Sequence, residues 1–195
     1  NEIQGSLLEN LLNTDKENLK TIGQEYITNL KNISNDSDIV TDKLPINFKW
    51  IGIIKLILPN SKIIHCVRNP KDNCLSIFKN YFVNPSLNFA YNLKEICEFY
   101  NFYNDLMIHW KNILPKFVID LKYEEIIKNP ELQIRNLLKS CNLSWNDNCL
   151  KFYNNKRVIK TASDIQARKK IYKSSVDSWK NYEKYLGEVF KTLPN

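Results

Sequence analysis

The sequence predicts an α/β fold in a single domain that spans residues 1–195. Two short apolar segments, KIIHCV (62–67) and KFVIDL (116–121), have the length and the β-branched content of buried strands. Between them, residues 93–114 repeat apolar side chains at helical spacing, and this alternation of strand and helix is typical of the α/β class. Only four glycines interrupt the chain, and no repeat or linker separates two domains.

The first part of the chain predicts two helices. Residues 19–33 carry apolar side chains at helical spacing, and the polar cluster NDSD (35–38) ends that helix. A short extended piece is expected at 38–41. The stretch INFKWIGIIKLILP (46–59) then predicts a mostly buried helix that Pro59 stops.

A helix start follows directly after the first strand. Asn69 is a favourable N-cap, and Pro70 suits the first helical position. In α/β sheets, ligands bind at the carboxyl ends of strands, where the next helix offers free N–H groups and the positive end of its dipole. We therefore expect an anion to bind here.

The second half of the chain predicts more helices than strands. NPELQIRNLLKSC (129–141) has a proline near its start, as helices often do, and another helix is expected near 147–153. Residues 157–180 are polar and basic with weak periodicity, so we expect a long loop with short helical pieces. The apolar face of the 93–114 helix is formed by Ile96, Phe99, Tyr103, Leu106 and Trp110.

Three residues suit the chemistry of an anionic ligand. Arg68 follows the first strand, and its guanidinium can bind phosphate bidentately, while Ser76, two helical turns further, can donate its hydroxyl to the same group. Lys43, in TDKLPINF (41–48), can stabilise charge on a leaving oxygen in phosphoryl or sulfuryl transfer. The alternative interpretation is a surface arginine, a solvent-facing serine and a solvated loop lysine.

The charge of the chain favours an anionic partner. Lysine and arginine exceed aspartate and glutamate by 28 − 21 = 7, which suits a nucleotide, a sulfated sugar, a nucleic acid or an acidic peptide. Basic residues and serines in the segment 160–187 suit wrapping over a phosphate-bearing ligand. The aromatic residues among them also suit stacking on RNA bases, so an RNA-binding module is a second hypothesis.

The sequence predicts neither a metal site nor a membrane span. Five cysteines form no CxxC pair and there are two histidines, while Cys141 and Cys149 are the one close pair worth testing as a disulfide. No apolar run approaches the roughly 20 residues of a membrane helix, and the first residues lack a signal-peptide pattern. We expect a soluble segment, cytoplasmic if the source is a bacterium.

Five segments, in this order, resemble the sulfotransferase family, most closely its tyrosylprotein-sulfotransferase-like branch and bacterial relatives associated with TPR repeats. They are DKLPINF, ILPNSKIIHCVRNPKDNCLS, VIDLKYEEIIKNPELQIRNLL, TASDIQARKKIYKSSV and WKNYEKYLG. The resemblance implies a three-layer fold like that of P-loop nucleotide kinases, with a parallel sheet flanked by helices. It also implies transfer of a sulfuryl group from 3′-phosphoadenosine 5′-phosphosulfate (PAPS) to an acceptor hydroxyl, of a protein tyrosine, a sugar or a small alcohol.

The resemblance also implies roles for individual residues. Arg68 and Ser76 match the pair that binds the 3′-phosphate of PAPS, and Lys43 matches the lysine that stabilises sulfuryl transfer. The other implied cofactor-binding residues are Tyr123, which contacts the nucleotide, Ser163, Gln166 and Arg168 of a cofactor-covering loop, and Lys180, which replaces a basic residue that relatives carry at position 178.

The chain departs from the family at its beginning. It contains no counterpart of the first strand or of the PxSGTT-like loop that cradles the 5′-phosphosulfate, and Glu2 is a weak stand-in for the acidic base that follows this loop. We therefore expect the isolated segment to be inactive. A nucleotide phosphotransferase is disfavoured because the GxxxxGK[ST] motif is missing. The expected partners are PAPS and a peptide or glycan acceptor, in preference to nucleic acid.

Overall fold

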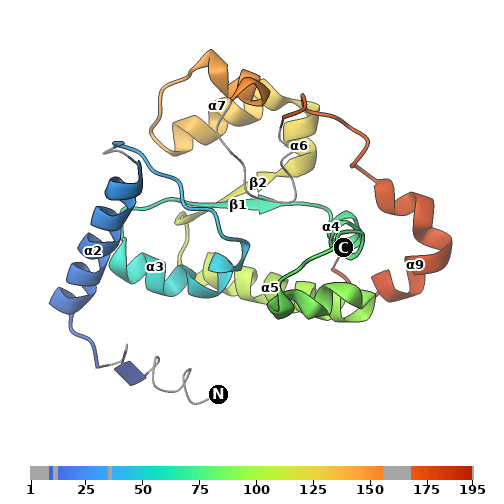
Figure 1. Cartoon of the computed structure of the whole chain (residues 1–195), viewed down its shortest axis with the longest axis horizontal. Helices are drawn as coiled ribbons and strands as arrows, with labels where there is room; N and C mark the ends of the chain where they lie inside the picture. The colour runs from blue at the N-terminus through green and yellow to red at the C-terminus, as the bar shows by residue number, and fades with distance from the viewer. Residues whose placement is uncertain (1–8, 11–12, 35–36, 156–167, 195) are drawn as a thin grey trace. The chain divides into compact units, whose positions relative to one another are not determined.

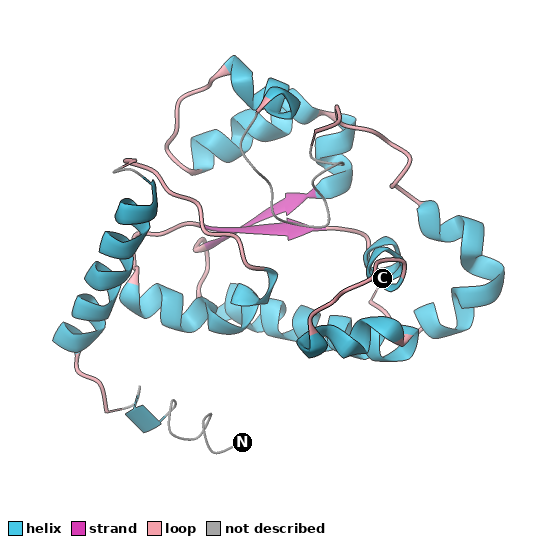
Figure 2. Ribbon diagram, viewed as in Figure 1, coloured by secondary structure: helices cyan, strands magenta, loops and turns pink. Residues whose placement is uncertain are grey.

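The computed structural model describes residues 9–10, 13–34, 37–155 and 168–194, and the chain divides into two compact units, residues 1–61 and 62–195 (Figures 1 and 2). Its described part is mostly helical, with one small parallel sheet. The predicted α/β class is therefore confirmed. Each unit is described on its own.

The first unit consists of two α-helices and a short 3₁₀ helix. Helix α2 spans Lys16–Ser34, as the periodicity predicts. The single helix expected over 46–59 is instead the 3₁₀ helix η1, Pro45–Trp50, followed by α3, Ile51–Ile57. Helix α3 ends before Leu58, because the residue that precedes a proline is disfavoured in the helical conformation.

Burial in this unit differs from the prediction. In the 46–59 stretch, Ile51 is the residue that is fully buried, so the expectation of a mostly buried helix is wrong. On α2, the buried position is Gly23, whereas Ile22 and Ile33 of the predicted apolar face are 45% and 79% exposed. The glycine turns toward α3 because only a residue without a side chain fits there. Residues 38–41 form no strand.

The second unit is built around two parallel strands. Strand β1, Ile63–Val67, pairs with β2, Val118–Lys122. The register pairs the first residue of β1 with the first of β2, and the last with the last. Helix α5, Leu93–Ile113, covers one face of the sheet, and α6, Tyr123–Lys128, and α7, Pro130–Ser140, lie on the other (Figure 1). Both predicted strands and the helices at 93–114 and 129–141 are confirmed.

Strand β1 is half-buried, not buried on both faces as predicted. Its side chains alternate between partly buried and exposed, with Ile64 and Cys66 on the exposed face. The described sheet has two strands, so less surface covers each strand than in a wide sheet. Burial of β1 depends on how many strands and helices surround it, which the pattern of a single segment does not show.

The predicted helix start after β1 is confirmed in detail. Helix α4 spans Pro70–Phe78, and the side chain of Asn69 accepts hydrogen bonds from the backbone N–H groups of Lys71 and Asp72, at 3.0 and 3.2 Å. These bonds satisfy donors that no helical carbonyl can reach. Strand, cap and helix therefore form one continuous unit.

The core of the second unit lies where α4, α5 and the C-terminal helices meet. The 3₁₀ helix η4, Ser178–Tyr182, and α9, Glu183–Phe190, bring Trp179 and Phe190 against Cys74 and Ile96. The remaining short helices are η2, Pro85–Tyr91, and η3, Asp147–Asn154, the latter at the predicted place. Residues 168–177 form a loop, as expected, whereas 156–167 lie outside the described residues.

A polar network joins both strands to α5. His65 Nδ1 lies 2.7 Å from Asp120 Oδ1, and Lys111 Nζ donates to Asp120 Oδ2 at 2.9 Å. The Tyr103 hydroxyl pairs with His65 Nε2. Partial burial raises the pKa of Asp120, but the hydrogen bonds from Lys111 and His65 outweigh it, so the net shift is downward. The network holds the sheet on α5, because the Asp120 carboxylate has a hydrogen-bond partner on each of its oxygens.

Gly23 provides a test of the close approach between α2 and α3. A Cβ at this position would lie 2.0 Å from the backbone oxygen of Ile57, so Gly23→Ala forces the helices apart. We expect a loss of about 1–3 kcal/mol in the free energy of unfolding, the usual cost of overpacking. Urea unfolding followed by circular dichroism measures it.

Gly187→Ala is the matched control, because this glycine also lies within a helix. Its added Cβ would meet Glu183 Cγ at 3.8 Å, an ordinary contact. Alanine favours helix by up to about 1 kcal/mol over glycine, so this variant should be unchanged or more stable. Equal effects of the two substitutions would show that the contact with Ile57 is not the cause.

Candidate functional site

The parallel register places two predicted site residues side by side. Val67 and Lys122 are the last paired residues of β1 and β2, so Arg68 and Tyr123 leave the sheet together. The Arg68 Cζ atom lies 5.0 Å from the centre of the Tyr123 ring, within the range of a cation–π contact. One residue further, the backbone N–H of Asn69 donates to Glu124 Oε1 at 2.8 Å.

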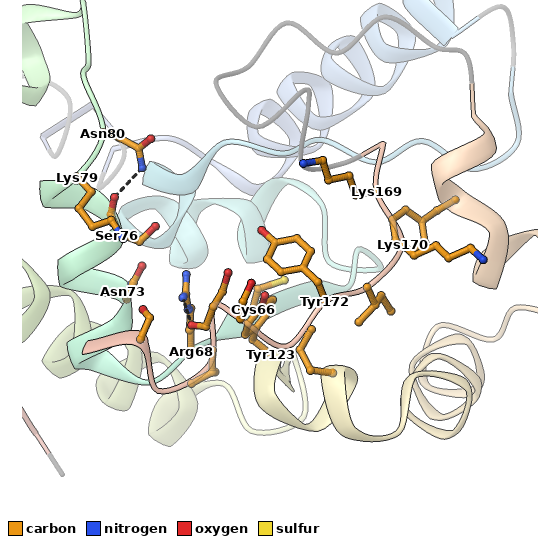
Figure 3. A pocket seen from close by; sticks show the side chains of 17 residues that line it. Cys66, Arg68, Asn73, Ser76, Lys79, Asn80, Tyr123, Lys169, Lys170 and Tyr172 are labelled. Carbon is orange, nitrogen blue, oxygen red and sulfur yellow. Dashed lines mark hydrogen bonds between the residues drawn. The ribbon is translucent and has the colours of Figure 1, made fainter. Parts of the chain in front are cut away.

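A cavity of about 660 Å³ opens at this end of the strands. The end of β1, the flank of α4, the start of α6 and the loop 169–178 form its walls (Figure 3). This place is where the sequence predicts an anion to bind. The lining includes Cys66, Arg68, Asn73, Ser76, Lys79, Asn80, Tyr123, Phe152, Lys169, Lys170, Tyr172, Ser174, Ser175 and Ser178.

The guanidinium of Arg68 keeps donors available toward the cavity. Its Nη2 donates to the backbone oxygen of Ser175 at 2.7 Å, which fixes the plane of the group. Its Nε is buried and has no hydrogen-bond partner within the described ranges. The guanidinium lines the cavity and carries a full positive charge, so it favours an anion there. The residues present therefore fit a phosphate group.

Tyr123 lies beside this guanidinium. Burial raises the pKa of its phenol, against the opposing effects of the Arg68 charge and of Ser175. The ring thus stays neutral at ordinary pH and offers an aromatic face and a hydroxyl. This position is the one that the sequence predicts for a nucleotide contact.

Helix α4 contributes a polar flank that the sequence analysis found only in part. Asn73 and Ser76 are three residues apart on one face of α4, Asn80 follows the end of the helix, and all three line the cavity (Figure 3). Asn80 Nδ2 donates to the backbone oxygen of Ser76 at 2.6 Å. Asn73, Asn80 and the neighbouring Lys79 were missed, although their helical spacing from Ser76 could have found them.

The opposite side of the cavity comes from the basic loop near the C-terminus. Lys169 and Lys170 lie across the cavity from Ser76 in Figure 3, and Tyr172 lies between Ser76 and these two lysines. Together with Arg68 these lysines make the lining positively charged. That this segment covers a ligand stays a prediction.

Two predicted cofactor-binding residues within the described ranges, Arg168 and Lys180, are not among the residues that line the cavity. Lys180 Nζ pairs with Asp177 Oδ2 at 3.0 Å, and Arg168 Nη1 donates to the backbone oxygen of Asn155 at 2.9 Å. Ser163 and Gln166 lie outside the described residues. Their assignments stay predictions.

Lys43 belongs to the first unit and has an exposed side chain. The residue before it is anchored, because the Tyr26 hydroxyl of α2 donates to Asp42 Oδ2 at 2.5 Å. This hydrogen bond, with burial and the Asp42 charge, raises the pKa of Tyr26 to about 12. The backbone immediately before the predicted catalytic lysine is thus held on α2.

The cysteines of the chain are free thiols, Cys141 and Cys149 included. Cys66 faces the cavity, and burial raises the pKa of its thiol. Among the residues that the structure describes, no group of three His, Cys, Asp or Glu side chains could hold a metal ion.

Residues 9–147 match the family model described as Sulfotransferase family. The chain belongs to this family. The resemblance to the sulfotransferase family noted in the sequence is confirmed. The matched range includes Lys43, Arg68, Ser76 and Tyr123.

The sulfotransferase chain also resembles a curated protein of Aquifex aeolicus (strain VF5). The two are 38% identical over 187 residues, and that relative is described as an uncharacterized protein. The alignment covers 95% of this chain and 25% of the relative, so the chain spans about a quarter of the length of the relative. None of the described helices has the length and apolar character needed to cross a bilayer.

The Tyr26 pKa gives a test of the anchor beside Lys43. Since the folded-state pKa of about 12 lies above the unfolded value of about 10, the stability that this hydrogen bond contributes is complete below pH 10 and is lost as the pH rises through 12. We expect the stability advantage of the wild type over Tyr26→Phe to shrink in this window. Urea midpoints across the window measure it.

Tyr185→Phe controls for the effect of removing a phenol, because this tyrosine is 76% exposed on α9. Its urea midpoint should fall between pH 10 and pH 12 as steeply as that of the wild type. If the urea midpoints of the wild type and Tyr26→Phe differed by the same amount at every pH, the anchoring hydrogen bond would be contradicted.

Proposed function

We propose that this sulfotransferase moves the sulfuryl group of PAPS to an acceptor hydroxyl. The observation that carries the proposal is the Arg68 guanidinium, which lines a positively charged cavity at the strand ends. A nucleotide with several phosphate groups suits such a cavity better than a neutral ligand does. Family membership favours a phosphosulfate among nucleotides.

Arg68 and Ser76 are proposed to bind the 3′-phosphate. The guanidinium is held in plane by Ser175 and by the Tyr123 ring, so little conformational entropy is lost when it binds an anion. The Ser76 hydroxyl, on the polar flank of α4, supplies a further donor. Tyr123 is proposed to contact the nucleotide with its ring and hydroxyl.

Lys43 is proposed to stabilise the charge that develops on the oxygen that leaves the sulfuryl group. Such transfers gain most of their catalysis from positioning and electrostatics, so a fixed cation is effective. PAPS, when bound, supplies the activated sulfuryl group. Ser163, Gln166, Arg168 and Lys180 are proposed to cover the nucleotide.

The larger arrangement is also a proposal. We infer that both units belong to one sulfotransferase domain with the three-layer, P-loop-kinase-like fold, and that the acceptor is a peptide tyrosine or the hydroxyl of a sugar or small alcohol. Two parallel strands with helices on both faces are consistent with that architecture. The match with about a quarter of a longer relative makes the full-length protein the proper subject of activity measurements.

Replacing Arg68 tests the phosphate site. In the full-length protein, Arg68→Ala should weaken binding of adenosine 3′,5′-bisphosphate about 10- to 100-fold, because hydrogen bonds to a charged group contribute about 1.5–3 kcal/mol. Adenosine 5′-monophosphate lacks the 3′-phosphate, so its affinity should change little. Isothermal titration calorimetry measures both.

Arg135→Ala is the matched control. This arginine lies on α7, pairs with Glu131 at 2.7 Å and does not line the cavity. It should leave both affinities unchanged. An equal loss in the two arginine variants would indicate a general charge effect, and steep salt-dependent binding of single-stranded RNA without any response to the bisphosphate would favour the RNA-binding hypothesis.

Replacing Lys43 tests the catalytic assignment. Lys43→Ala should lower kcat about 10²- to 10³-fold, the usual effect of losing one group that stabilises transition-state charge, with a small change in bisphosphate affinity. Lys20→Ala, an exposed lysine on α2 that pairs with Glu17, is the control. Wild-type kcat in the Lys43 variant would refute the role.

A further inference from the structure

Asp72 is the buried carboxylate of the second unit that the proposed chemistry does not use. It is 1% exposed and lies in the first turn of α4, four residues after Arg68 and four before Ser76. An acidic residue at this place normally interacts with the helix dipole in water. Burial of a charged group needs a stronger reason, because it is favourable only when partners satisfy the charge.

The partners of Asp72 come from the other end of the chain. Its Oδ2 accepts a hydrogen bond from the backbone N–H of Asp177 at 2.7 Å. Its Oδ1 accepts two, from the Ser178 hydroxyl at 2.8 Å and from the backbone N–H of Trp179 at 2.9 Å. Three donors on one carboxylate bind the segment that leads into η4 to the start of α4.

The segment fixed in this way is a wall of the cavity. Ser174, Ser175 and Ser178 line it, and the Ser175 carbonyl accepts the hydrogen bond from Arg68. Asp177 adopts a left-handed conformation, with φ of 58°, so the chain turns sharply at the residue that Asp72 holds.

We propose that Asp72 is a positioning residue for the nucleotide site. Through Asp177, Ser178 and Trp179 it holds the wall 174–178 against Arg68, so that the guanidinium keeps the orientation that an anion requires. This inference rests on the proposed function for the identity of the ligand. It concerns a residue that touches no ligand and acts through Arg68 and the wall.

Asp72→Asn tests the proposal, because asparagine has nearly the same volume. Its amide oxygen can keep the bonds from Ser178 and Trp179, whereas its NH₂ group faces the N–H of Asp177, donor against donor. In the full-length protein we expect affinity for adenosine 3′,5′-bisphosphate to fall about tenfold or more. Hydrogen exchange in peptides covering 172–182 should accelerate about tenfold.

Two comparisons separate positioning from a loss of stability. Asp120→Asn also removes a partly buried carboxylate with two partners, but Asp120 does not line the cavity, so bisphosphate affinity should stay within about twofold. In an Arg68→Ala background, Asp72→Asn should lower bisphosphate affinity by less than about threefold, because Asp72 acts on the ligand through the same arginine. Additive losses, or an equal loss in Asp120→Asn, would overturn the proposal.

The outcomes also separate this inference from the proposed function. If the wild type binds the bisphosphate and Asp72→Asn binds it equally well, the positioning role is wrong while the function stands. If the wild type does not bind it, the proposed function fails, and exchange in 172–182 decides whether Asp72 holds the wall: acceleration supports this, and unchanged exchange refutes it.

If Asp72→Asn does not fold, Ser178→Ala takes its place. This variant removes one hydroxyl and leaves both backbone bonds to Asp72. Because Ser178 also lines the cavity, exchange in 172–182 is the measurement, and it should accelerate about threefold. Unchanged exchange would contradict the proposal.

Discussion

The parallel pairing of β1 with β2 is the constraint on which the site depends. Its register ends at Val67 and Lys122, so Arg68 and Tyr123 emerge at the same height and the arginine lies over the ring. Parallel strands lie about 4.8 Å apart, close enough for the residues that follow them to interact directly. A slip of one residue would turn one of the two side chains to the other face of the sheet and separate the pair.

The sequence predicts those parts of the fold that depend on local patterns. The strand lengths, the long helix between them and the Asn69–Pro70 helix start needed only periodicity and capping preferences, and the structure confirms them. The half-buried state of β1 and the packing of α2 through Gly23 depend on distant elements, and periodicity could not show them. Asp72 is a clear case, since its partners lie 105 and more residues away.

The candidate site was predictable to a similar degree. Arg68 and Ser76 were predicted from their positions after the strand and on the helix, and Tyr123 from the resemblance to the family. The structure brings all three to one cavity together with the basic loop. Asn73 and Lys79 were missed because neither residue type is distinctive alone, although each lies three residues from Ser76, Asn73 within α4 and Lys79 at its C-cap. The role proposed for Lys43 stays a prediction; the residue lies in the first unit, where the Tyr26 hydroxyl donates to the neighbouring Asp42.

The small size of the sheet has a consequence for its edges. Within the described residues, β1 and β2 pair only with each other, so each strand leaves backbone donors and acceptors open along one side. Charged side chains discourage the addition of another strand, and β2 carries Asp120 and Lys122, whereas IIHCV of β1 has no acidic or lysine side chain. The sheet is therefore unequal: β2 is protected against intermolecular pairing, and β1 is the edge at which a further strand can extend it.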